Sequence, residues 1–138
     1  MKLVECIPNF SEGRDPKIIQ AIADAIQSVP NVWLLHVDAG YDANRTVYTF
    51  VGDIHSIAEA AFQAIQAAAR LINMEVQQGE HPRMGACDVC PFVPLGETSM
   101  EEVIELTHQL GQRLGNVGIP VYMYEESALI PERKNLAF

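Results

Sequence analysis

The chain has 138 residues, of which 49% are hydrophobic and 20% charged; this composition suits one globular domain and excludes a disordered tail. The net charge is −9, which argues against a nucleic-acid-binding surface, because phosphates require a basic face. The longest apolar stretch, 57–72, is interrupted by Glu59 and Arg70, and the N-terminus lacks the apolar core of a signal peptide. We therefore expect a cytoplasmic protein that does not span a membrane.

The first half of the chain predicts one helix among three strands. Val, Ile and Leu dominate the first segment, and Asp15 followed by Pro16 is typical of a helix start. The predicted elements are a strand over 2–7, a polar turn over 9–13, a helix from Asp15-Pro16, and strands over 32–39 and 45–52.

The second half predicts two helices and two strands. Ser56 with Glu59, and Ser99 with Glu102, both have the spacing of a capping box, which marks a helix start. The predicted elements are a helix from Ser56 to Ile72, a strand over 86–93, a helix from Ser99 that ends at Gly115 to Gly118, and a strand over 119–124.

The predicted order is β-α-β-β-α-β followed by α-β. We therefore predict an α+β fold, a ferredoxin-like βαββαβ sandwich with an additional C-terminal α-β extension. Helices would cover one face of its sheet. Strand 45–52 carries Val47, Thr49 and Val51 on one side and Thr46, Tyr48 and Phe50 on the other, so neither side is fully polar. We expect the uncovered face to meet a second domain, another subunit or a ligand.

Three cysteines in a chain without an export signal argue against a disulfide framework. Cys87 and Cys90 have C-x-x-C spacing, and His81 is close in sequence. A structural zinc site usually needs two such pairs, and two cysteines in one strand would point to opposite faces. Buried free thiols are the favoured interpretation over a metal or redox site, and no metal is predicted.

The segment Gly79-Glu80-His81-Pro82-Arg83-Met84-Gly85 concentrates charge and proton-handling groups just before a predicted strand. Chemistry tends to lie in loops at strand ends, and nearby charges readily tune a histidine across neutral pH. A surface loop with a solvated histidine is the alternative. His36 is interpreted as a structural residue of its strand, and His55 and His108 as solvated side chains.

Two further polar segments follow the ends of predicted strands. Asp38 is placed where a carboxylate can orient an imidazole, although a turn residue is an equally good interpretation. Arg45 can bind a carboxylate through a bidentate fork or cap a strand end. Arg83 has the same two interpretations, with a surface charge as a third.

Four segments of the sequence have to be considered together: Val4-Glu5-Cys6-Ile7-Pro8-Asn9-Phe10-Ser11-Glu12-Gly13, Val37-Asp38-Ala39-Gly40, Asn44 to Gly52, and Gly79 to Gly85. In this order they resemble the N-terminal subdomain of the glutamate formiminotransferase family. Further agreement comes from Asp88-Val89-Cys90-Pro91-Phe92 and Pro120-Val121-Tyr122, so that the resemblance runs from about Leu3 to the end.

The resemblance implies folate-dependent transfer of a formimino group from N-formimino-L-glutamate to N5 of tetrahydrofolate, the co-substrate, in histidine degradation. His81 falls on the family's catalytic histidine, a general acid and base, and Asp38 on an acidic residue thought to assist it. The family's ferredoxin-like domain agrees with the predicted order of elements.

From charge we expect Arg45 and Arg83 to hold the substrate carboxylates or the folate tail, with Asn9 and Glu80 of the matching motifs also in substrate binding. The family enzyme has two subdomains with folate between them, so residues 1–138 are expected to be one incomplete part that works with a C-terminal subdomain or partner subunit. A homodimer is also expected. The alternative is a non-catalytic folate-type binding or interaction module that acts with a partner chain.

Overall fold

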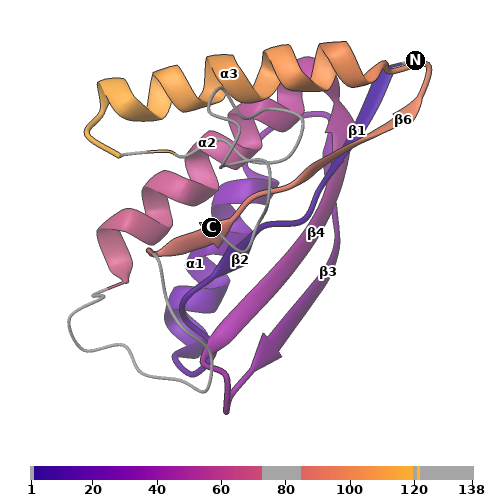
Figure 1. Ribbon diagram of the computed structural model, residues 1–138. Coiled ribbons are helices and arrows are strands. Elements are labelled where there is room, and N and C mark those ends of the chain that lie inside the picture. The colour runs from indigo at the N-terminus through magenta and orange to yellow at the C-terminus, as the bar shows by residue number, and fades with distance from the viewer. Residues whose placement is uncertain (1, 73–84, 120, 122–138) are drawn as a thin grey trace.

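The computed structural model describes residues 2–72, 85–119 and 121. Within these ranges, a strongly curled six-stranded sheet carries three helices on one of its faces (Figure 1). The predicted α+β class is therefore confirmed. None of the helices in the described ranges is long and apolar enough to cross a membrane.

The sheet is organised around one long central strand, β4. It pairs with three other strands, β1, β2 and β3, and all pairings in the sheet are antiparallel. The strand order is β5-β2-β4-β1-β6, with β3 also paired to β4. The strands are β1 (Lys2–Cys6), β2 (Asn9–Phe10), β3 (Val32–Gly40), β4 (Arg45–Asp53), β5 (Cys87–Val89) and β6 (Phe92–Gly96).

Two predicted elements differ from the structure for the same reason. The polar turn predicted over 9–13 is wrong at its start, since Asn9 and Phe10 form β2, and the single strand predicted over 86–93 is split into β5 and β6. Pro8 and Pro91 lie at these two breaks, and proline has no N–H to donate to a sheet ladder. The ferredoxin-like topology stays a prediction, because the sheet has two more strands than that pattern.

Helices α1 (Pro16–Gln27) and α2 (Ile54–Leu71) each begin at an aspartate. Asp15 caps α1 as predicted. The predicted start of α2 at Ser56 is wrong, because Asp53 at the end of β4 is the cap and its Oδ1 accepts the N–H groups of His55 and Ser56, both at 3.0 Å. The Ser56 hydroxyl only supports this cap by donating to Asp53 Oδ2 at 2.8 Å.

Helix α3 (Met100–Asn116) has the capping box that the sequence predicts. Ser99 and Glu102 cap each other reciprocally. At its other end, Gly118 has φ of +85°, and the N–H groups of Gly118 and Ile119 bond to the carbonyls of Gly115 and Leu114 in a Schellman motif. The strand predicted over 119–124 is wrong at Ile119, which is in no strand, and most of it lies outside the described residues.

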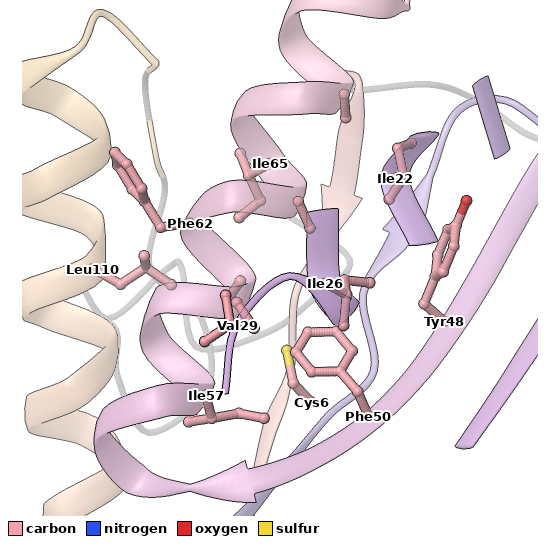
Figure 2. Packing of buried hydrophobic residues seen from close by; sticks show 14 of the residues in the cluster. Cys6, Ile22, Ile26, Val29, Tyr48, Phe50, Ile57, Phe62, Ile65 and Leu110 are labelled. Atoms are coloured by element: carbon pink, nitrogen blue, oxygen red, sulfur yellow. The ribbon is translucent and has the colours of Figure 1, made fainter. Parts of the chain in front are cut away.

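The core lies between the helices and one face of the sheet. On β4 the buried residues alternate with half-buried ones, and Tyr48 and Phe50 are fully buried against α1 and α2 (Figure 2). The Tyr48 hydroxyl donates to the Ile19 carbonyl at 2.8 Å, and burial raises the pKa of Tyr48. Small residues let α2 lie close to the sheet; those buried on it are Ala60, Ala61, Ala64, Ala67 and Ala68.

The cap of α2 gives a first prediction. Asp53→Ala should lower the free energy of unfolding by about 1 kcal/mol at neutral pH, whereas Ser56→Ala should cost clearly less, because Ser56 does not accept the orphan N–H groups. Urea unfolding measures both. An equal or larger loss in Ser56→Ala would contradict the assignment of the cap.

The pH dependence of that loss follows from the same hydrogen bonds. Slight burial raises the pKa of Asp53, but hydrogen bonds from Ser56 and His55 outweigh it and hold the pKa below its usual value of 3.8. The cap therefore stabilises the fold above the unfolded pKa and loses this effect as pH falls through the folded pKa. The difference between wild type and Asp53→Ala should shrink as pH falls below about 4.

Candidate active site

Asn9 and Asp38 lie in one row across the sheet, on the face that the described helices leave open. Val47 of β4 is opposite Asp38 of β3 and also opposite Asn9 of β2. Directly opposed residues point to the same face of an antiparallel sheet. Val47 alternates with the buried Thr46 and Tyr48, so the row faces away from the core.

A β-bulge in β3 sets the direction of Asp38. The register shifts between Leu34 and His36, which leaves Leu35 as the extra residue. Without that residue, the two-residue period would turn Asp38 to the side of the buried Thr46. The bulge also turns His36 to the open face, where it is opposite Thr49 and exposed; this placement differs from the structural role expected for it.

Arg45 lies on the same face at the start of β4, and its Nη2 donates to Asp88 Oδ2 at 2.7 Å. The pair is largely shielded, since the side chains are 22% and 12% exposed. Asp88 thereby fixes one side of the guanidinium. A guanidinium has five N–H donors, so an ion pair through one nitrogen is compatible with a further anionic ligand.

The segment that follows Asn9 packs directly against the turn between β3 and β4. A Cβ on Gly13 would lie 2.4 Å from the Gly40 carbonyl oxygen, so no side chain fits there. Asn44, with φ of 54°, accepts the Gly13 N–H at 2.8 Å, and Thr46 donates to the Glu12 carbonyl at 2.6 Å. Two of the predicted polar segments are therefore brought together.

The third polar segment reaches the same place through its last residue. The Ser11 hydroxyl donates to the Gly85 carbonyl at 2.7 Å, and the Ser11 N–H donates to the Ala86 carbonyl at 2.8 Å. Gly85 is the final residue of the histidine motif. The predicted site residues Glu80, His81 and Arg83 themselves lie outside the described residues.

The open face combines apolar and charged groups, as the sequence predicts. Trp33 is 56% exposed and Val93 38% exposed, and Val47, Thr49 and Val51 are half-buried. Trp33 is opposite Val51, on the same side as the Asn9 and Asp38 row. Such a face suits a flat, partly apolar ligand with anionic ends or a covering protein surface.

Comparison with known proteins shows the family of the chain. The family model described as "Formiminotransferase domain, N-terminal subdomain" matches residues 3–138. The chain belongs to this family. It resembles glutamate formimidoyltransferases of Thermoplasma acidophilum, with 52% identity over 138 residues, and of Streptococcus pyogenes serotype M1, with 48% identity over 137 residues. Formimidoyltransferase-cyclodeaminase of Gallus gallus is 52% identical over 136 residues.

These matches cover 98% to 99% of this chain but only part of each relative. The chain spans 46% of either glutamate formimidoyltransferase and 25% of the avian protein. This formiminotransferase N-terminal subdomain therefore corresponds to less than half of a homologous transferase.

Two residues at the candidate site, Asp88 beside Arg45 and Ser11 beside Gly85, were not among the predicted site residues. Both lie in segments that resemble the family, but neither was assigned a contact or a role. A charged residue inside an apolar run is the signal that points to Asp88, since such a residue is seldom buried without a partner. In the described ranges, no group of three or more His, Cys, Asp or Glu side chains could hold a metal ion.

The Arg45–Asp88 pair gives a second prediction. Asp88→Asn should lower the free energy of unfolding by about 1–3 kcal/mol, because it leaves a shielded guanidinium without its counter-charge. A double-mutant cycle with Arg45→Met, measured by urea unfolding, should show that the two losses are not additive.

The exposed Arg113–Glu59 pair, at 2.9 Å with side chains 47% and 38% exposed, is the matched control. Its cycle with Arg113→Met and Glu59→Gln should give a coupling below about 1 kcal/mol. Equal coupling in both cycles would show that shielding at Arg45 has no energetic effect.

Proposed function

We propose that this chain is the N-terminal part of a glutamate formimidoyltransferase, which moves a formimidoyl group from N-formimino-L-glutamate to tetrahydrofolate. The observation that carries the proposal is about 50% identity to two enzymes of that name along nearly the whole chain. The convergence of Asn9, Asp38 and Arg45 on one sheet face supports it. A cytoplasmic location and a homodimer stay predictions.

In this proposal His81 is the general acid and base. It accepts the proton that N5 of tetrahydrofolate loses on bonding to the formimidoyl carbon, and it returns a proton to the departing nitrogen of glutamate. One imidazole with a pKa near neutrality can perform both transfers in turn. The neutral imidazole accepts the first proton, and the protonated imidazole that results can then donate a proton to the departing nitrogen. His81 precedes Gly85 by four residues in the sequence. The hydroxyl of Ser11, two residues after Asn9, donates to the Gly85 carbonyl.

Asp38 assists His81 in the proposed mechanism. A carboxylate that accepts one imidazole N–H fixes the tautomer and favours the protonated form, which the histidine needs as an acid. Asp38 is exposed on the open face, so its carboxylate is available from the side on which the substrates are proposed to lie.

The substrates carry several carboxylates, and the proposed binding residues match this charge. Arg45 and Arg83 are the cations, with Asn9 and Glu80 as further polar contacts. The half-buried Val47 and Thr49 beside them offer a partly apolar surface against which the rings of a folate can pack. We propose that folate lies over this face and that a C-terminal subdomain or partner subunit covers it.

The ferredoxin-like topology is part of the same proposal. If β1 with β2, and β5 with β6, are the halves of two strands broken at Pro8 and Pro91, six elements in the order β-α-β-β-α-β remain before α3. β4 is one continuous strand and pairs with both β1 and β2, which supports the idea that these two are halves of one strand.

The proposed role of His81 is tested in the complete enzyme, with the C-terminal continuation present. His81→Ala should lower kcat for formimidoyl transfer by about 10²- to 10⁴-fold, the usual contribution of one general acid–base group. Initial rates with tetrahydrofolate and N-formimino-L-glutamate measure it.

Two histidines serve as controls. His55→Ala alters an exposed residue at the start of α2 and should leave the rate unchanged, while His36→Ala tests the exposed histidine that shares the face of Asp38. Loss with His36→Ala and none with His81→Ala would reassign the base. No transfer in the wild-type enzyme would favour the non-catalytic binding module.

The open face gives a fourth prediction. Val47→Lys should lower kcat/KM for tetrahydrofolate by about 10- to 100-fold, because an unpaired ammonium must be desolvated when the face is covered, at a cost of about 1–3 kcal/mol. Steady-state kinetics of the complete enzyme measures this change.

Val117→Lys is the matched control, since Val117 is 49% exposed just after α3 and lies outside the proposed site. Urea unfolding of both variants separates a loss of folding from a loss of binding. Unchanged kcat/KM in a stable Val47→Lys enzyme would place folate elsewhere.

A further inference from the structure

Three cysteine thiols meet where the chain crosses from β5 to β6 beside β1. The Sγ atoms of Cys6 and Cys90 are 3.6 Å apart, and the Sγ of Cys87 donates to the Val89 carbonyl at 3.5 Å. The expectation that Cys87 and Cys90 point to opposite faces of one strand is wrong, because β5 ends at Val89 and Pro91 interrupts the sheet.

The three thiols differ in their surroundings, although all are free. Cys6 is fully buried and lies next to Phe50 in the core (Figure 2). Cys87 and Cys90 are half-buried at the edge of the same core. Cys90 is therefore nearer to solvent than Cys6, which has no exposed surface.

Hydrogen bonding distinguishes Cys90 from its neighbours. Hydrogen bonding with the neighbouring thiols, Cys6 first and then Cys87, lowers the pKa of the Cys90 thiol, since a hydrogen bond to its sulfur stabilises the thiolate. Burial raises the pKa of Cys6, and the hydrogen bond to Cys90 raises that of Cys87. Cys90 is thus the thiol most readily ionised, and thiolates are the nucleophiles in thiol oxidation.

We propose that Cys6 and Cys90 form a reversible disulfide when the protein meets hydrogen peroxide. Cys87 remains a thiol, because its Sγ donates to the Val89 carbonyl rather than contacting Cys6. In contrast to the interpretation of the cysteines as inert buried thiols, the cluster is then a site of oxidative modification. The inference does not depend on the proposed function, because the bond itself is the readout.

The chemistry balances without a further reactant. The Cys90 thiolate attacks one peroxide oxygen, the O–O bond breaks, hydroxide leaves, and Cys90 becomes a sulfenic acid. The Cys6 sulfur then attacks the sulfenic sulfur, the S–S bond forms, and the hydroxyl group leaves as water with the Cys6 proton. The two sulfurs lose two electrons, which reduce one peroxide to two waters once the hydroxide takes up the proton that the Cys90 thiol released on ionising.

The Cys6–Cys90 disulfide would change the candidate site by moving Asp88. Closing the present 3.6 Å gap to a disulfide length of about 2.05 Å draws the Cys90 segment towards β1. Asp88, two residues before Cys90, is part of that segment and holds Arg45 at 2.7 Å. The Arg45–Asp88 pair is therefore expected to shift when the cluster is oxidised.

The test maps the bond in the full chain. The native protein is treated with hydrogen peroxide, free thiols are blocked with N-ethylmaleimide, and tryptic peptides are analysed with and without reduction. The expected product joins the peptide Leu3–Arg14 to the peptide Met84–Arg113, with Cys87 alkylated, and it disappears on reduction with dithiothreitol.

Variants and the unfolded chain complete the test. Cys87→Ser should still form the link, because serine keeps a donor, whereas Cys90→Ser should form none. If Cys90→Ser fails to fold, oxidation of wild type in urea is compared instead and should give mixed pairings where the native protein gives one. A Cys87–Cys90 bond as the main native product, separate sulfinic acids, or stoichiometric zinc on the thiols would overturn the proposal.

Discussion

The rest of the structure depends on the one-sided burial of β4. Thr46, Tyr48 and Phe50 take every second position of this strand and are fully buried under the helices. The described helices all lie on that face, and the apolar stripes of α1 and α2 find their partners there. The alternate positions of β4 therefore face the open side of the sheet, where a ligand or another protein surface can contact them. The candidate site is a consequence of how the core is built.

The two-residue period of β4 could be predicted from sequence, but its consequence for β3 could not. Alternation assigns residues to faces only where the register is known, and the bulge at Leu35 reverses the assignment for Asp38. Local signals were sufficient for the Asp15 cap and the Ser99 capping box. They gave the wrong cap at Ser56, because Asp53 at the end of β4 is also a possible cap and the local pattern does not decide between the two.

For the site, the sequence predicted which segments converge better than which side chains pair. Asn9, Asp38 and Arg45 lie on one face as expected, although their roles and those of Glu80, His81 and Arg83 stay predictions. The pairing of Asp88 with Arg45 was not predicted, because the two residues lie on strands that are two positions apart in the sheet. β2 lies between β4 and β5 and pairs with both, and these two pairings set the position of the Asp88 carboxylate relative to Arg45.

One short segment, Cys87 to Pro91, links the charge of the site to the thiols of the core. β5 is a three-residue strand, and its only partner in the sheet as described is the two-residue β2, so few ladder hydrogen bonds set its position. The Arg45–Asp88 pair and the Cys6–Cys90 contact hold the same segment from opposite faces of the sheet. The Ile7 N–H also donates to the Pro91 carbonyl at 3.1 Å, so a covalent change at the thiols would be resisted by this bond and by the ion pair together. Because Asp88 belongs to the segment that would move, Arg45 is the residue through which the core can act on the open face.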